Sequence, residues 1–588
     1  MKKSLSQALI MPLVLAGCFT GISARADGEL SLKRDKSLGR PITSTLLQRA
    51  PQRTAAPAIA TKANGARLRA SVLYTDSWES TGSYKFGIYE FPAEGSYSST
   101  PVYLNDAFDP TGGAALIGGD RYLMTHSESA YGYTFVNHLL TSTSDWGSFK
   151  TYDGNNTSIS RDMAWDHVSG KLYGCFRTED GKGWVFGTLD PDNLDKERTK
   201  ISELTERWDA MSFDRIGRLY VITQSGKLCR VDKSNGAMTV IGETGLTTSY
   251  NTTGAIDPES GKFYFLPVLD QPTYLYAIDL ETAQATPVYR MNDGEQLAGM
   301  YFAKEAVNAS APAVATNLSA TFDHKTFKGS VSFKMPATTA GGTTASGTLT
   351  YKVYANGESA AQGTGTYGQN ITANLTLKEG GEYAFEIVTS NASGSSEGAW
   401  TSAFVGPDAP SAVESVEMIN VGDRIILQWK AVTTAAHGGL IEPDEVTYTV
   451  TRYPEGKVVE QSTKATAFTE VLPEGEPMML YYTVTPEYGS HKGAETKTTE
   501  ILYGAFNTPY FADFTNSDDL KYLTIADANG DGRRFNQGLD DDNNACLYLP
   551  AASITYADDY IFSAPLNLKK GLLYRLSSIL GVAGRHDG

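Results

Sequence analysis

The sequence predicts an all-β chain whose N-terminal half is a β-propeller, and three observations support this prediction. Residues 165–173, 213–220 and 256–264 share one pattern, in which an apolar residue and an aspartate precede a turn with glycine and a Leu/Phe-Tyr strand. The pattern recurs with a period in the forties, which is typical of propeller blades. The chain is also rich in Tyr (33) and Gly (57) and has no long stretch of helical apolar periodicity. In its second half, apolar and polar residues alternate between frequent turn residues, as in antiparallel sandwiches.

The predicted propeller runs from residue 69 to residue 306 and contains about five blades. Each clear unit has a further strand that ends in an aspartate: Asp190, Asp232 and Asp279. A weaker copy lies at 114–123, and the last copy, 297–302, stops early. We therefore expect this last strand to complete the blade begun by residues 70–105, which closes the ring without a free sheet edge. The count rises to six if the strands near 130–150 form a sheet of their own.

Length, charge and cysteine content limit the classes of function. A chain of 588 residues exceeds what one hydrophobic core serves, so several domains are expected. The net charge of −17 argues against nucleic acid, which needs a basic face, and it leaves carboxylates for calcium. Among the cysteines, Cys175 and Cys229 lie on predicted blade strands, and their spacing allows a disulfide without requiring one. We expect free buried thiols, because the core does not depend on disulfides.

The N-terminal residues 1–26 are predicted to be an export signal. Two lysines precede an apolar run from Ala8 to Ala16, which is too short to span a bilayer. Residues 15–18 resemble a lipobox, in which Cys18 is lipidated, whereas residues 24–26 resemble a signal-peptidase site. Both routes place the chain at the cell surface, in the outer membrane or outside the cell, with membrane contact only through a lipid anchor. The Arg/Ala/Pro/Thr-rich residues 27–68 are predicted to be a disordered linker.

Two segments, 310–406 and 407–504, have the alternation and turn spacing of β-sandwiches. They resemble fibronectin type III domains, which carry a core Trp on an early strand and a Tyr-x-Val strand late in the domain. The second segment has Trp429 and the strand 481–484. The first segment has Phe333 in the tryptophan position, so it matches the pattern less closely.

The C-terminal segment, 506–588, resembles the cleaved-adhesin (choice-of-anchor J) jelly rolls of exported Bacteroidetes proteins, including the adhesin regions of gingipains. The resemblance is carried by an opening Asp-Phe strand at 513–514, the loop 527–532 and the run 557–565. Tyr560 stands where this family usually has Trp. Such domains need about twice this length, so a partial jelly roll is expected.

A structural calcium site is predicted in this segment. Asp527, Asn529 and Asp531 are spaced two apart on a glycine-bearing loop, which lets alternate oxygens converge on one hard cation. An EF-hand is excluded because its twelfth position is Gly538 instead of Glu. The jelly-roll resemblance points to the same ion. Asp513 and Asp559 are weaker candidates to complete the site.

Other residues that invite a functional interpretation are better explained by structure. Asp166, Asp214 and Asp257 could form a carboxylate ring, but a residue repeated in every blade is expected to cap the same turn in each. Trp165, Trp184 and Trp208 could line a sugar-binding face, although Trp165 occupies the same core position as Phe213 and Ile256. No catalytic residue is predicted, because the seven histidines fall in no motif for a nucleophile or a metal.

These observations favour an exported, non-catalytic surface protein that recognises a glycan or a matrix or cell-surface protein. A propeller-based glycan-active enzyme with accessory modules is the first alternative, and it requires Asp/Glu and Arg at the central opening of the ring. A surface scaffold that self-associates without ligand is the second. The ligand and the oligomeric state are left open by the sequence.

Overall fold

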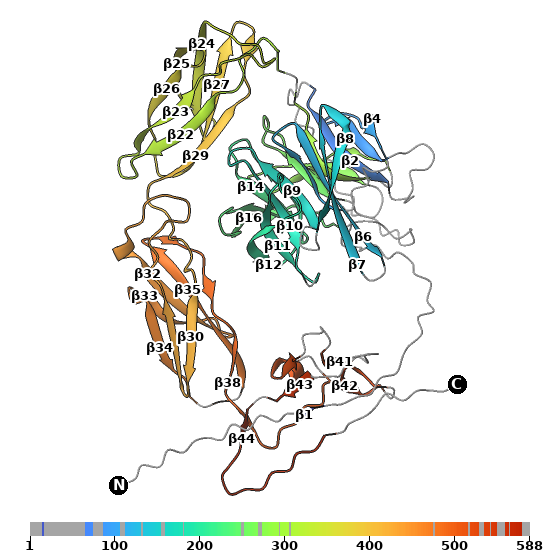
Figure 1. Cartoon of the computed structure of the whole chain (residues 1–588), viewed down its shortest axis with the longest axis vertical. Helices are drawn as coiled ribbons and strands as arrows, with labels where there is room; N and C mark the ends of the chain where they lie inside the picture. The colour runs from blue at the N-terminus through green and yellow to red at the C-terminus, as the bar shows by residue number, and fades with distance from the viewer. Residues whose placement is uncertain are drawn as a thin grey trace, which may run out of the picture. The chain divides into compact units, whose positions relative to one another are not determined.

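The chain is all-β apart from two short helical turns, and most of its sheets are small and antiparallel (Figure 1). The computed structural model describes residues 15–16, 65–74, 86–105, 112–130, 133–154, 159–179, 181–248, 252–267, 273–292, 295–304, 307–473, 475, 477–515, 518–528, 534–540, 543–549, 559–563 and 565–578. It forms two compact units: residues 29–407 with 437–439, and residues 1–28 with 408–436 and 440–588. No helix among the described residues has the length and apolar character needed to cross a membrane.

Residues 67–302, the five-sheet region, form five four-stranded antiparallel sheets. Four of them use consecutive strands, and the fifth has the order β21-β2-β3-β4. The strands are β2 (Arg67–Tyr74), β3 (Gly87–Pro92), β4 (Thr100–Leu104), β5 (Ala114–Ile117), β6 (Arg121–Ala130), β7 (Tyr133–Ser142), β8 (Asp145–Gly154), β9 (Ser160–Asp166), β10 (Lys171–Arg177), β11 (Trp184–Leu189), β12 (Thr199–Leu204), β13 (Trp208–Phe213), β14 (Leu219–Thr223), β15 (Lys227–Val231), β16 (Met238–Glu243), β17 (Thr253–Ile256), β18 (Phe263–Leu266), β19 (Tyr274–Ile278), β20 (Ala285–Arg290) and β21 (Glu295–Phe302).

The last strand of the region pairs with its first. β21 lies antiparallel to β2, with Leu68 opposite Phe302 and Val72 opposite Leu297, which confirms the pairing expected for residues 297–302. The strands near 130–150 belong to the sheet β5-β6-β7-β8, so they add no sheet of their own. No sheet among the described residues closes on itself.

The strands β5, β9, β13, β17 and β21, here called the inner strands, lie beside one another in that order, and β21 lies beside β5. Side chains on β13, β14, β17 and β18 are almost all buried, since each of these strands is covered on both faces. The outer strands β12 and β16 are largely exposed. This gradient explains why the inner strands are largely apolar, apart from polar and charged residues near the starts of β9, β13 and β21, whereas the outer strands are more polar.

Two sandwiches follow, each with a three-stranded sheet and a larger one, the arrangement of a fibronectin type III-like domain. In the first, β22-β23-β26 faces β25-β24-β27 with β28 and β29; in the second, β30-β31-β34 faces β33-β32-β35 with β36, β37 and β38. Their strands are β22 (Thr316–Phe322), β23 (Lys328–Lys334), β24 (Thr348–Ala355), β25 (Glu358–Thr366), β26 (Asn370–Thr376), β27 (Gly381–Asn391), β28 (Gly394–Ser395), β29 (Ala399–Val405), β30 (Val416–Val421), β31 (Arg424–Trp429), β32 (Thr447–Tyr453), β33 (Lys457–Thr463), β34 (Ala467–Val471), β35 (Met478–Tyr488), β36 (His491–Lys492), β37 (Thr496–Lys497) and β38 (Ile501–Tyr503), with a 3-10 turn η3 (Pro443–Glu445).

The two sandwich cores are built around equivalent aromatic pairs. Trp429 at the end of β31 packs edge-on against Tyr448, with ring centroids 5.5 Å apart. In the first sandwich, Phe333 near the end of β23 packs edge-on against Tyr351 at 5.3 Å. Phe333 therefore occupies the position that the sequence assigned to it.

The C-terminal segment contains small sheets only. β40 pairs with β43 and β43 with β1, β41 pairs with β42, and β39 pairs in parallel with β44. Their bounds are β1 (Leu15–Ala16), β39 (Phe506–Asn507), β40 (Thr524–Asp527), β41 (Asn536–Leu539), β42 (Ala545–Tyr548), β43 (Asp559–Phe562) and β44 (Leu566–Asn567), with one helical turn α1 (Asp518–Lys521). Large apolar side chains here, such as Phe511 and Leu573, are exposed. Among the described residues of this segment, no sheet has more than three strands.

Candidate functional site

Charged and hydroxyl side chains gather where the inner strands β9, β13 and β17 begin. Arg161 on β9, Asp209 on β13 and Thr252 just before β17 each lie five residues before a turn aspartate of the repeat, Asp166, Asp214 or Asp257. They thus share one repeat position, although their chemistry differs. Together with Asp162, Arg207, Thr248 and Thr253, these residues form what we call the inner-strand cluster.

Two guanidinium groups of the cluster converge on one carboxylate. Arg161 Nε donates to Asp209 Oδ1 at 2.9 Å, and Arg207 Nε donates to the same oxygen at 2.5 Å. Arg207 Nη2 also donates to Asp209 Oδ2 at 3.3 Å. The side chains of Arg161 and Asp209 are completely buried, whereas that of Arg207 is 9% exposed. Buried charges persist only when they are paired in this way.

Hydroxyl groups complete the shell around Asp209. Thr248 donates to Asp209 Oδ2, and Thr252 Oγ1 donates to the backbone oxygen of Asp209 at 2.5 Å. Arg161 Nη2 lies 3.4 Å from Thr252 Oγ1, which links β9 to the start of β17. Burial lowers the pKa of Arg161, an effect that the charge of Asp209 opposes.

Asp162, the second carboxyl group of the cluster, has no arginine partner at hydrogen-bond distance among the described residues. Its Oδ2 accepts the backbone N–H of Met211 at 2.9 Å, and Thr253 Oγ1 lies 3.5 Å from its Oδ1. Burial raises the pKa of Asp162 well above its usual range, and the N–H of Met211 opposes this only in part. Burial thus disfavours the charged form of this carboxyl group, while its backbone hydrogen bonds favour that form.

The repeated aspartates cap turns, as the sequence predicted. Asp166 Oδ1 accepts Val168 N–H at 3.0 Å, and Asp214 Oδ1 accepts the N–H groups of Ile216 (3.0 Å) and Arg218 (2.9 Å). Asp257 Oδ1 accepts Glu259 N–H at 3.1 Å. The same role is filled on the third strands by Asp190, Asp232 and Asp279. These carboxylates hold the chain reversals and form no catalytic ring.

The tryptophans do not form an exposed platform for sugar. Trp208 is completely buried beside Phe186, with ring centroids 5.0 Å apart. Trp165 and Trp184 are half-buried and pack against the apolar clusters of the region. Trp165 thus contributes to the core, as its repeat position predicted.

The predicted calcium ligands are brought together in part. Asp527 and Asp559 are directly opposite each other in the β40–β43 pair, so two carboxyl groups face the same neighbourhood. Asp513 instead closes a local turn, where its Oδ1 accepts Thr515 N–H at 3.0 Å and Thr515 Oγ1–H at 2.7 Å. Asn529 and Asp531 lie outside the described residues, as does the lipidation candidate Cys18. The described residues contain no group of three or more metal-ligating side chains.

The cysteines of the five-sheet region are free thiols. Cys175 and Cys229 are buried and unpaired, and Cys546 is half-buried and free. Burial raises the pKa of Cys175 to about 12, so the unreactive thiol form prevails. The disulfide that the spacing allowed is not formed.

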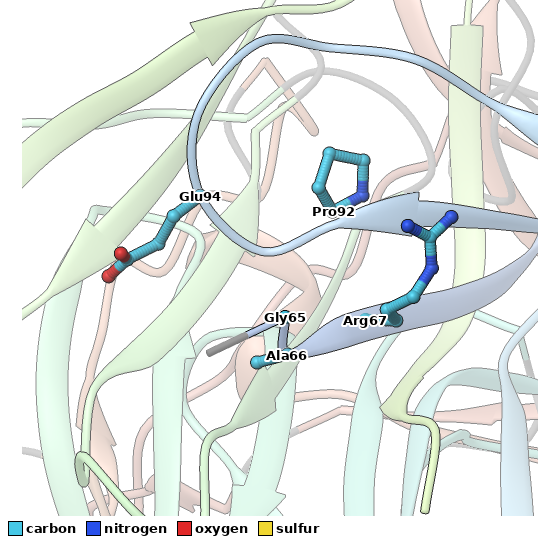
Figure 2. Close-up of a pocket in the computed structure, with 5 residues that line it drawn as sticks. All are labelled: Gly65, Ala66, Arg67, Pro92 and Glu94. Carbon is cyan, nitrogen blue, oxygen red and sulfur yellow. The ribbon is translucent and has the colours of Figure 1, made fainter. Parts of the chain in front are cut away.

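The hollow drawn in Figure 2 lies beside β2 and β3, and no residue of the inner-strand cluster lines it. It is lined by Gly65, Ala66, Arg67, Pro92 and Glu94, and its cavity volume is about 60 Å³. Figure 2 shows Arg67 and Glu94 on opposite sides of Pro92. Because ligand pockets usually measure several hundred Å³, this hollow holds only a few waters.

The sequence motifs did not identify the inner-strand cluster. Arg161, Asp162, Arg207 and Asp209 belong to no catalytic or ligand-binding motif, and they are not repeated between units. One feature of the sequence could have indicated the cluster. Arg161 and Asp209 are charged residues on buried strands, and each lies five residues before the turn aspartate of its unit.

Known proteins share little sequence with this chain. No protein-family model matches the sequence. No curated protein matches it either. Among solved structures, a segment of two fibronectin type III domains from chicken tenascin is 11% identical, with a TM-score of 0.16, and the match covers 32% of this chain and 99% of that one. The chicken CNTN1 FN1–FN3 domains are also 11% identical, with a TM-score of 0.15, and the match covers 41% and 76% of the two chains. Similarity at this level carries no information about activity or partners.

Proposed function

We propose that this chain is an exported, non-catalytic surface protein that binds a glycan or protein ligand outside the cell. In this proposal the five-sheet region is a five-bladed β-propeller and its inner strands surround the central axis. The supporting observation is the cyclic neighbourhood of the inner strands, together with the pairing of β21 with β2. A ring of this kind presents the strand ends and their loops as a ligand face.

The two fibronectin type III-like sandwiches serve as spacers in this proposal. Their buried side chains are almost entirely apolar and form one compact core in each domain. Each core is complete within its own domain, as a module that carries another domain requires. The exported location rests on the signal segment 1–26, with either lipidation at Cys18 or cleavage after residue 26.

The C-terminal segment is proposed to be part of a cleaved-adhesin-like jelly roll with a structural calcium ion. Asp527 and Asp559 fit a hard divalent cation, because carboxylate oxygens from two paired strands can bind the same ion. Asn529 and Asp531 would supply further oxygens from the same loop. Asp513 is a poorer ligand candidate, since its carboxylate already holds a turn.

A binding screen tests the proposed function. The purified full chain is applied to immobilised glycans and host matrix proteins, once with calcium and once with chelator. Saturable binding to a defined ligand is expected. If calcium is required, the C-terminal segment takes part; if not, the five-sheet region is the binding module. The absence of binding in both conditions contradicts the proposal.

One observation favours a second candidate, a propeller-based glycan-active enzyme. The inner-strand cluster brings Asp162 and Asp209 together with Arg161 and Arg207, the residue types that this alternative requires at the centre of a ring. Burial raises the pKa of Asp162, as it does for many general acids, while Asp209 is paired with two arginines. Hydrolysis of a glycan by the wild type that is lost in Asp162→Asn establishes this candidate. A surface scaffold, the remaining alternative, predicts self-association without any ligand.

A further inference from the structure

We propose that the exposed edge of Arg207 is a binding site for a single carboxylate group, and that this group belongs to an acidic sugar. This inference rests on the proposed function and deepens it, since it names the ligand chemistry and the place. The first argument is the balance of charge, because two guanidiniums share the one carboxylate of Asp209. Asp162, the other carboxyl group of the cluster, accepts the backbone N–H of Met211 and has no arginine at hydrogen-bond distance among the described residues. Around Asp209, two guanidiniums therefore face one carboxylate within a chain of net charge −17.

The second argument is access. Arg161 is fully buried behind Asp209, whereas part of the Arg207 side chain reaches the surface. Arg207 contacts Asp209 through Nε and Nη2. Among the described residues, its Nη1 has no hydrogen-bond partner, so its N–H groups are available to a ligand. A guanidinium whose other edge is fixed by a buried carboxylate is already oriented for a second carboxylate.

The third argument is a buried polar group on another inner strand that has no partner among the described residues. Gln296, at the start of the inner strand β21, is completely buried, and neither atom of its amide has a partner among the described residues. β21 lies beside β17 and close to β9. An unpaired buried amide costs about 1–3 kcal/mol, which a structural core normally avoids. The inner strands therefore contain a buried amide whose hydrogen bonds no described residue satisfies.

Size and charge select the kind of carboxylate. Only one edge of one arginine is accessible, which suits one carboxylate and excludes recognition of a run of charges. The strongly negative chain repels polyanions, so a single uronate at the end of a glycan is favoured over a highly sulfated or polyacidic chain. Charge-assisted hydrogen bonds to the guanidinium then supply the specificity.

The test measures binding of methyl β-glucuronide and methyl β-glucoside to the full chain by calorimetry and ligand-observed NMR. The glucuronide is expected to bind at least about tenfold more tightly, because the two ligands differ by the carboxylate that Arg207 receives. This difference is expected to shrink with added salt. Equal binding of the two sugars, or binding of neither, overturns the inference. N-acetylglutamate amide is the third probe, and if it binds as tightly as the glucuronide, the ligand is an acidic peptide and the assignment to sugar is wrong.

Variants locate the site. Arg207→Gln is expected to lose the preference for glucuronide, and Arg207→Lys to retain only part of it, since an ammonium cannot form the fork. Arg218→Gln is the matched control, because Arg218 pairs with Asp214 at 2.6 Å in the β13–β14 turn at the far end of the same inner strand. A preference unchanged in Arg207→Gln overturns the assignment. If Arg207→Gln fails to fold, Arg207→Lys and the wild-type salt dependence still decide. If the chain binds a matrix protein or a neutral glycan but does not bind the glucuronide, the inference about Arg207 is wrong and the proposed function still stands.

Discussion

Replacement of Asp209 by Asn tests how strongly the inner-strand cluster depends on one carboxylate. The substitution preserves the shape of the side chain but removes the negative charge that faces Arg161 and Arg207. Arg161 is completely buried, so its guanidinium loses its ion-pair partner in a place without water. Breaking a buried ion pair from one side costs about 3–5 kcal/mol.

In a domain of this size, a loss of 3–5 kcal/mol corresponds to a fall in Tm of about 10 °C. The assay is differential scanning calorimetry of the full chain, together with the fluorescence of Trp208, which is adjacent to Asp209 in sequence. The transition of the five-sheet region is expected to move to lower temperature, while the transitions of the sandwiches stay in place, since their cores are separate. The chain is multidomain, so each transition is compared with its wild-type counterpart and no single free energy is assigned.

Asp279→Asn provides the matched control, because Asp279 is an exposed turn cap that accepts Glu281 and Thr282 N–H groups at 2.9 and 2.8 Å. It is expected to cost about 1 kcal/mol or less, like the loss of other capping hydrogen bonds. The double variant Arg161→Met/Asp209→Asn is expected to regain part of the stability lost in Asp209→Asn. Equal shifts for Asp209→Asn and Asp279→Asn would refute the buried-pair reasoning.

Three further predictions concern pH, thiols and calcium. Burial lowers the pKa of His138 from 6.5 to about 4, so the folded state binds the proton more weakly than the unfolded state. The contribution of neutral His138 to the free energy of unfolding is therefore complete above pH 6.5. This free energy is expected to fall by about 3 kcal/mol as the pH drops to about 4. Urea unfolding measured from pH 7 to pH 4 checks this prediction. If the free energy of unfolding of His138→Gln falls with pH as steeply as that of the wild type, the prediction is wrong. Of Cys175, Cys229 and Cys546, only Cys546 is expected to react with a thiol reagent in the native chain, whereas labelling of Cys175 at a comparable rate speaks against its burial. Asp527→Ala is expected to lower the Tm of the C-terminal segment only when calcium is present, because the variant loses up to about 2.7 kcal/mol of stabilisation by bound calcium at a hundredfold excess over Kd. Asp540→Ala, which removes a hydrogen bond to the backbone N–H of Asn544, serves as the control. Identical melting of the Asp527 variant and wild type in calcium would rule the site out.

The features that repeat along the chain could be predicted from the sequence. Asp166, Asp214 and Asp257 do the same work in three successive units, so their recurrence indicated a turn cap and the structure confirms it. Phe333 could be matched to Trp429 because both lie at or next to the last residue of the second strand of a sandwich. The pairing of β21 with β2 followed from two incomplete copies at the two ends of the repeat.

The features that depend on differences between repeats could not be predicted. Arg161, Asp209 and Thr252 occupy the same position in three successive units, but the residue type differs in each unit. A comparison of the units for identical residues therefore does not identify this position. Their interaction depends on which inner strands are neighbours, which is a tertiary fact. The facing of Asp527 and Asp559 similarly depends on strand register, which the loop spacing alone does not set.

The pairing of β21 with β2 also dictates when folding can finish. Leu68 and Phe302 are opposite one another across the pair, so the first strand of the region has no partner on that side until the last has been synthesised. Contacts of such high sequence separation form slowly, because the intervening chain must be closed into a loop first. On a ribosome, the other four sheets have all their strands before the fifth does. The nascent chain is therefore expected to emerge as an open arc, whose two ends join only when translation has passed residue 302.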